Sequence, residues 1–279
     1  MILGQYLGCK NSSYLESRKT VLSGRANYGR ILTYRDANTN FSEHEIKNDL
    51  CSQGYSAVLL ARDEGDKSLT EKFKILGNPL LELENQGMAE ESTSYILNLK
   101  CLYSSTTNKS LQPFSGNALT LHTEHSARPV EVQPKYIVLY CVNSGHKEDR
   151  VFTIMQPIDQ ILSVLSPAVV KILKNTRYNF KSNSPQIIRV EKGRKILAFR
   201  DFMDEPLPWI CTVDGVTEQD VNNSIESLIN SMYVAVSLTA IAWSTGLAVV
   251  FDNTRFLHGR TQSEQTVASN RNLKRLKFI

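Results

Sequence analysis

The chain has 279 residues, 41% of them hydrophobic and 22% charged, which are ordinary values for a globular protein and exclude wholesale disorder. Its 32 basic and 28 acidic residues leave a net charge of only +4 without a basic stripe, so we expect no nucleic-acid partner. The most apolar stretches are interrupted by polar residues or are shorter than the roughly 20 residues of a membrane helix, so we expect no membrane partner.

The cysteines indicate a reducing compartment. Their number, five, is odd, and no two of them have C-x-x-C spacing, which argues against a disulfide framework and a zinc ribbon. The first residues also lack the basic and apolar regions of a signal peptide. We therefore expect free thiols in a cytoplasmic protein, and a single domain over residues 1–279.

The N-terminal third predicts helices and one buried strand. Residues 1–40 are polar and rich in turn residues, and we interpret them as an arm. A helix is expected over Ser42–Ser52, where the opening serine and a glutamate three residues later form a capping-box pattern. The apolar run Tyr55–Leu60 predicts a strand, and Lys67–Leu76 a second helix. Turn residues throughout 80–115 favour a loop, a candidate lid.

The remainder predicts a mainly β protein with flanking α-helices. Strands are expected at 118–124, 135–142, 151–155, 187–190, 196–199, 234–242 and 247–251. Helical periodicity predicts helices over 158–173 and 217–233, the second opened by Thr217 and two acidic residues. Many short strands with few helices indicate a β-core, either a sandwich or a barrel, with the helices packed outside it.

Two of the five histidines begin an H-x-E triplet, a pattern that is weak evidence by itself. His146 lies in a charged run typical of a solvated loop. His122 ends an apolar strand, and residues i and i+2 of a strand point to the same side, so His122 and Glu124 share a face. They supply two of the three ligands of a facial triad for ferrous iron. His258 is the candidate third ligand, although a half-buried structural histidine is an equally simple interpretation of that residue alone.

Three segments, LTLHTEHSARPVEVQPKYIVLYCV, GLAVVFDNTRFLHGRT and NRNLKRLKF, together resemble one family. They look like the clavaminate-synthase-like branch of iron(II)/2-oxoglutarate-dependent oxygenases, which is related to taurine dioxygenase and includes amino-acid hydroxylases of antibiotic biosynthesis. The resemblance implies a double-stranded β-helix (jelly-roll) core, an Fe(II) cofactor, 2-oxoglutarate as cosubstrate and O2. It is weak over residues 1–40 and 80–115.

Carried over to this chain, the resemblance implies that His122, Glu124 and His258 are the metal ligands. It implies that Arg271 binds the distal carboxylate of 2-oxoglutarate, as a buried guanidinium is suited to do, and that the hydroxyl of Thr153 binds the same carboxylate. Two departures bear on these roles. KEDRVFT replaces the glycine-rich turn expected before the threonine, and the spacing from His258 to Arg271 is about one residue shorter than in the branch.

The resemblance also implies a substrate side of the site. Arg275 would bind a carboxylate there, and Asp201 would bind a cationic group. Without the resemblance, Arg271 and Arg275 would be taken for a solvated basic tail, and Asp201 for an exposed loop acid.

The implied activity is oxidation, foremost hydroxylation, of an sp3 carbon in a small molecule, an amino acid or a metabolite derived from one. Desaturation, cyclisation and epimerisation stay open, whereas the carboxylate of Glu124 argues against a halogenase. Two other classes remain as alternatives. A cupin-like metal protein without 2-oxoglutarate chemistry would keep the His/Glu/His set but would not need Arg271, and a non-catalytic binding protein would release no succinate.

Overall fold

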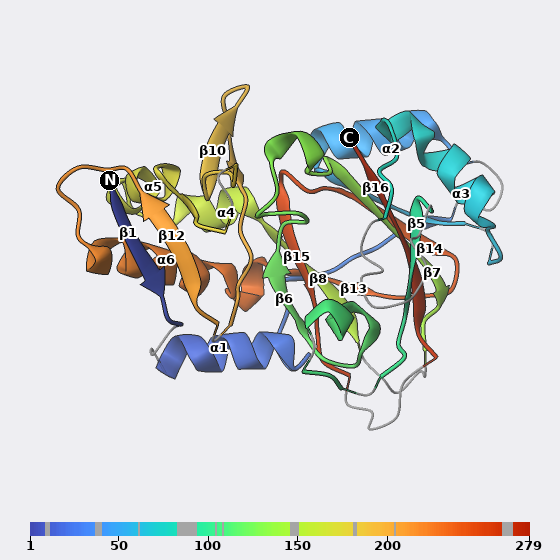
Figure 1. The fold of residues 1–279 in the computed structure, drawn as a ribbon. Coiled ribbons are helices and arrows are strands. Elements are labelled where there is room, and N and C mark those ends of the chain that lie inside the picture. Colours follow the sequence, from blue (N-terminus) through green and yellow to red (C-terminus); the bar gives the residue numbers. More distant parts are fainter. Residues whose placement is uncertain are drawn as a thin grey trace.

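The fold of the protein is mainly β with flanking helices, as the sequence predicts (Figure 1). The computed structural model describes residues 1–8, 12–36, 41–60, 62–82, 94–103, 105–107, 109–145, 151–180, 183–203, 205–263 and 270–279.

Two central sheets form the core. The five-stranded sheet has the order β2 (Arg30–Ile31), β13 (Thr239–Ala242), β8 (Phe152–Pro157), β15 (Phe256–Arg260) and β6 (Leu119–His122). The six-stranded sheet has the order β3 (Arg35–Asp36), β4 (Tyr55–Leu59), β14 (Leu247–Asp252), β7 (Tyr136–Asn143), β16 (Asn272–Phe278) and β5 (Ile96–Lys100). Apolar side chains of both sheets, including Met155 and Ile241 from one and Leu139 and Val249 from the other, pack together in one buried cluster, so the two sheets face each other.

The strand β7 is almost continuously apolar because both of its faces are buried. Its residues Ile137, Leu139 and Cys141 point into the space between the sheets, whereas Val138 and Tyr140 belong to the cluster on the outer face. Helices α2 (Glu43–Ser52) and α3 (Asp66–Phe73) cover that outer face (Figure 1). Because both faces of β7 are buried, neither set of alternating positions is polar.

The outer face of the five-stranded sheet is covered by a second layer of helices. These are α1 (Ser12–Leu22), α4 (Ile158–Ser163), α5 (Pro167–Lys174) and α6 (Glu218–Met232). A three-stranded sheet of β1 (Ile2–Tyr6), β12 (Leu207–Cys211) and β9 (Thr176–Tyr178) lies in the same layer, on the left in Figure 1. The strands β10 (Ile188–Glu191) and β11 (Arg194–Leu197) form a separate two-stranded hairpin.

The helix caps follow the sequence closely. The side chain of Ser42 accepts a hydrogen bond from the backbone N–H of Glu45, which begins α2. Gly54 follows that helix with φ of 82°, a left-handed conformation that glycine adopts without a steric penalty. Thr217 and Asp220 form a reciprocal capping box at the start of α6.

Several segments differ from the prediction, among them the expected strand 118–124, which ends at His122. The expected helix over 158–173 is two helices, because Ser166 and Pro167 begin a new one; proline suits the first helical turn and interrupts a helix interior. The expected strand 234–242 begins only at Thr239, after a 3-10 turn over Ala235–Ser237. The described part of the expected arm contributes β1, α1, β2 and β3, and Tyr14 and Val21 of α1 are buried in the core.

Part of the candidate lid 80–115 lies outside the described residues. The rest contains β5 and a 3-10 helix over Lys109–Phe114. His146 also lies outside the described residues. Over the part of the chain that the structure describes, no helix combines the length and apolar character needed to cross a bilayer.

Candidate metal centre

The pairing of β6 with β15 brings two histidines together. In this antiparallel pair, His122 is the direct cross-strand partner of His258, and their ring centroids lie 4.3 Å apart. The register shifts after His258, at Gly259. A Cβ at Gly259 would lie 2.7 Å from the carbonyl oxygen of Leu119, so only glycine permits the two strands to approach so closely.

Glu124 is brought to the same point by a side-chain clamp on its backbone. The amide of Asn253 accepts a hydrogen bond from the Glu124 N–H at 2.8 Å and donates to the carbonyls of Glu124 and Pro134 at 3.3 and 2.9 Å. Asn253 follows β14 and is buried. The D-N-T-R-F-L-H-G-R segment therefore supplies both the third candidate ligand, His258, and the residue that holds the H-T-E turn in place.

The surroundings of both imidazoles favour their neutral form. Desolvation, with a further contribution from the positive charge of Arg200, lowers the pKa of His122. Desolvation, followed by the neighbouring His122, lowers the pKa of His258 well below its usual value. Nδ1 of His122 donates to the Thr120 carbonyl at 2.7 Å, which leaves the lone pair on Nε2. Neutral imidazole is the form that binds a metal ion.

The three side chains fit a divalent metal ion. One ligand atom each from His122, Glu124 and His258 lies within 4.8 Å of the other two. Nε2 of His258 is 3.7 Å from Oε2 of Glu124, which is too long for a hydrogen bond. Two ligands that are each about 2.1 Å from one ion lie about 3–4 Å apart, so this spacing suits a shared ion. Two imidazoles and one carboxylate form the donor set of non-haem iron(II) sites.

These ligands line a cavity of about 310 Å³ between the two sheets. Residues of β6, β8 and β15 form one wall, and residues of β5, β7 and β16 form the opposite wall. Arg271 and Thr153, both buried, line the cavity together with the three candidate ligands. The hydroxyl of Thr153 accepts a hydrogen bond from Trp243 Nε1 at 3.0 Å, so its own hydrogen remains available as a donor.

Arg275 is buried and is held by two carboxylates. Its Nε and Nη2 atoms donate to Glu82 at 3.1 and 2.9 Å, and its Nη1 donates to Glu124 Oε1 at 3.0 Å. Lys277 lies 2.9 Å from Glu82 and also donates to His125 Nε2 at 3.1 Å. Arg275, which without the resemblance would be taken for part of a solvated tail, therefore belongs to a buried charge network beside the candidate metal ligands.

Asp201 is buried rather than exposed, and it is not among the described residues that line the cavity. Its carboxylate accepts a hydrogen bond from Tyr233 at 2.7 Å and forms an ion pair with Arg18 at 3.4 Å. The structure brings six of the seven expected site residues to one cavity and places Asp201 beside α1 and α6.

Sequence reasoning missed several arginines of this cavity. Arg260 follows His258 by two residues and donates to the carbonyls of Gln112, Pro113, Ser115 and Asn117. Arg200 pairs with His122 in an isolated β-bridge, and Arg128 follows the H-T-E turn. The H-G-R triplet is a signal for Arg260, but nothing near Arg200 in the sequence connects it to the histidines.

Comparisons with known proteins identify the fold. No model of a known protein family matches the chain, and no curated protein matches its sequence. The structure is similar to that of PvcB from Pseudomonas aeruginosa, with a TM-score of 0.65 and 19% identity over 88% of this chain and 83% of that chain. PvcB is an Fe, α-ketoglutarate-dependent oxygenase from an isonitrile synthetic pathway.

Two further structures contain a hydroxylated amino acid and succinate. Asparagine oxygenase, in complex with Fe(II), 2S,3S-3-hydroxyasparagine and succinate, has a TM-score of 0.61 and 13% identity over 85% of this chain and 78% of that chain. The non-haem iron oxygenase OrfP, in complex with Fe, succinate and (3S)-hydroxy-L-Arg, has a TM-score of 0.61 and 15% identity over the same shares. The chain thus has the fold of iron-dependent oxygenases, in agreement with the fold that the sequence resemblance implies.

Proposed function

We propose that this protein is an Fe(II)/2-oxoglutarate-dependent oxygenase that oxidises, foremost by hydroxylation, an sp3 carbon of a small amino-acid-derived molecule. The observation that carries the proposal is the convergence of His122, Glu124 and His258 in a cavity that Arg271 also lines. The two facing sheets support a double-stranded β-helix core, and the iron-dependent structural neighbours support the chemistry.

Each residue of the cavity has a role in this proposal. His122, Glu124 and His258 would hold the iron, which when bound supplies the oxidising chemistry with O2 and 2-oxoglutarate. Arg271 and Thr153 would bind the distal carboxylate of 2-oxoglutarate, one by charge and the other by its hydroxyl. Arg275 holds one oxygen of Glu124, which leaves the second oxygen directed toward His258. The walls of the two sheets exclude bulk water from the reacting carbon.

The proposal keeps the small-molecule substrate, the cytoplasmic location and the absence of a nucleic-acid partner that composition predicts. Natural-product biosynthesis is the expected setting, since PvcB belongs to a synthetic pathway. Desaturation, cyclisation and epimerisation stay alternatives, because they depend on the position of the substrate carbon relative to the metal.

A turnover assay tests the proposal. Purified protein with Fe(II), 2-oxoglutarate and O2 should release succinate, and a suitable substrate from a panel of amino acids and their derivatives should increase that release. A product heavier by one oxygen identifies hydroxylation, and one lighter by two hydrogens identifies desaturation or ring closure. Metal binding without any dependence on 2-oxoglutarate would instead favour the cupin-like alternative.

A further inference from the structure

The cavity contains far more positive than negative charge. Five arginines line it, whereas Glu124 is the only carboxylate among its described lining residues. Arg260 is committed to four backbone carbonyls, and Arg275 to Glu82 and Glu124. Arg271 is assigned to the cosubstrate. Two arginines, Arg128 and Arg200, remain without a role in the proposed function.

These two arginines are available for an anion. Within the described part of the chain, the guanidinium of Arg200 has one hydrogen bond, to the neutral side chain of Gln112 at 3.4 Å, and its positive charge lowers the pKa of His122. Arg128 is held through its backbone, which bonds to His125 and Gln133, and its guanidinium contacts no carboxylate among the described residues. Both side chains are half-buried at the cavity. A guanidinium in that position binds a carboxylate by two parallel hydrogen bonds.

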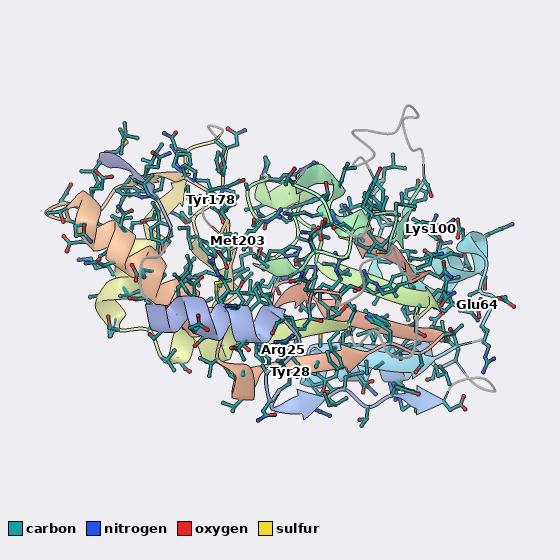
Figure 2. The ribbon with its side chains drawn as sticks, turned by 90° about the horizontal axis from the view of Figure 1, so that it is seen from below. Arg25, Tyr28, Glu64, Lys100, Tyr178 and Met203 are labelled. Atoms are coloured by element: carbon teal, nitrogen blue, oxygen red, sulfur yellow. The ribbon has the colours of Figure 1, made fainter. Side chains whose placement is uncertain are left out.

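An aromatic wall stands beside these arginines. Phe180 and Phe202 line the cavity, and their ring centroids lie 5.8 Å apart, each within 5.8 Å of Tyr178. Tyr178 lies on the helix-rich side of the molecule in Figure 2, away from Lys100 and Glu64 on the opposite side. Phe180 is 46% exposed as a residue, so an apolar group placed against its ring would remove apolar surface from water.

Among the described lining residues, no carboxylate is left for a cationic group. Glu124 belongs to the candidate metal ligands, and Asp201 is bound to Arg18 and Tyr233 outside the cavity. An ammonium or guanidinium entering among five arginines would be desolvated without an opposite charge, which is strongly unfavourable. The substrate expected from the resemblance, a zwitterion held through both of its charges, does not match this lining.

We propose that the substrate is a carboxylate with an aromatic or apolar body and no cationic group, its amine being absent, acylated or otherwise uncharged. Arg200, assisted by Arg128, binds the carboxylate, and the body packs on Phe180 and Phe202. This inference rests on the proposed function, because it assigns Glu124 to the metal and Arg271 to 2-oxoglutarate.

Equilibrium binding tests the inference without turnover. Protein loaded with Mn(II) and 2-oxoglutarate in the absence of Fe is titrated calorimetrically with 3-phenylpropanoate, its amide, N-acetyl-L-phenylalanine, L-phenylalanine and L-arginine. The N-acetyl compound and 3-phenylpropanoate should bind at least about tenfold more tightly than L-phenylalanine and L-arginine, because no buried ammonium is left unpaired. 3-Phenylpropanoate should also bind more tightly than its amide, which lacks the negative charge.

Variants separate recognition from a structural effect. Arg200→Ala should abolish the preference for the acid over the amide while Mn(II) and 2-oxoglutarate still bind, and Arg200→Lys should restore part of it. Phe180→Ala should weaken the binding of 3-phenylpropanoate and the binding of its amide by the same factor. The preference for the acid over the amide should therefore remain. Arg194→Ala, which removes an exposed arginine from the β10–β11 hairpin, is the matched control. It should change neither the affinity for the acid nor its preference over the amide.

The outcomes distinguish this inference from the proposed function. Failure to bind Mn(II) or 2-oxoglutarate contradicts the proposed function and the inference with it. If both bind, the inference alone is overturned by any of three results: tighter binding of the free amino acids, an unchanged preference in Arg200→Ala, or no binding of any aromatic carboxylate.

Discussion

Arg275 donates a hydrogen bond to Glu124 at 3.0 Å, so a buried guanidinium orients the carboxylate that we assign to the metal. Glu82 accepts two hydrogen bonds from the same guanidinium, and it also pairs with Lys277. Arg275 was expected at the substrate side of the site. Its contacts indicate that it also positions Glu124, a candidate metal ligand. Side chains that hydrogen-bond to a ligating carboxylate commonly orient it in this way.

Glu82→Gln should therefore affect both stability and metal affinity. The substitution leaves Arg275 and Lys277 buried with less compensating charge, and breaking a buried pair costs about 3–5 kcal/mol of unfolding free energy. We expect a loss of that size in denaturant unfolding, together with about 10–100-fold weaker metal binding. Glu71→Gln, at an exposed pair with Lys74, is the control and should change stability by less than about 1 kcal/mol. Equal effects of the two substitutions would contradict the proposed network.

Removal of one candidate ligand should abolish metal-dependent activity while the fold remains. His122→Ala or His258→Ala leaves two of three donors, so we expect at least about 100-fold weaker Fe(II) binding in anaerobic titrations. Circular dichroism should report an intact fold. The matched control is His44→Ala, an exposed histidine of α2. Turnover at the wild-type rate in either ligand variant would exclude this site.

Arg271→Ala should raise the requirement for 2-oxoglutarate. Loss of one partner of a buried charge pair costs about 2–5 kcal/mol, which corresponds to more than about tenfold in affinity. The measurement is succinate release as a function of 2-oxoglutarate concentration. Lys274→Ala is the control on β16, the strand that follows Arg271, since Lys274 pairs with Asp66 at 2.8 Å and is not among the described residues that line the cavity. An unchanged requirement in Arg271→Ala would place the anchor elsewhere.

Cys141 should resist alkylation at mildly alkaline pH. Burial raises the pKa of its thiol to about 12, although the nearby charge of Arg271 opposes the shift, so almost no thiolate exists near pH 8. Because the raised pKa favours the protonated thiol, reactivity should increase only as the pH approaches that value or when the protein unfolds. Mass spectrometry after iodoacetamide treatment should find Cys51, which is exposed, modified before Cys141. Simultaneous modification of both would indicate that β7 opens readily.

Gly259→Ala should destabilise the protein. The added methyl group would lie 2.7 Å from the Leu119 carbonyl, and overpacking of this kind costs about 1–3 kcal/mol. Thermal unfolding measures the change. At Gly65 an added Cβ meets nothing within 4 Å, so Gly65→Ala serves as the comparison and should have a smaller effect.

Local features of the chain were readable from the sequence because they depend on neighbouring residues. The caps at Ser42 and Thr217 need only a side chain and a backbone N–H three residues apart. The two-residue period of a strand predicted that His122 and Glu124 share a side, and the motifs around them predicted His258 as the third ligand; in the structure the strand ends at His122, and the Asn253 clamp on the following turn brings Glu124 to the histidines. The strand β16 was a readable feature that we missed. Leu273, Arg275 and Lys277 alternate along it as a strand requires, whereas local pattern alone, without the resemblance, indicated a solvated tail.

Only the tertiary structure decided which distant side chains meet these residues. Glu82 is 193 positions from Arg275, and Arg18 is 183 positions from Asp201. Such pairs follow from the register of the sheets and from the packing of α1, which depend on contacts along the whole chain. The sequence therefore determined the kinds of residue in the site and most of the elements that present them. The fold determined that Asp201 lies outside the cavity and that Arg200 lies inside it, because burial depends on which elements pack together and not on local pattern.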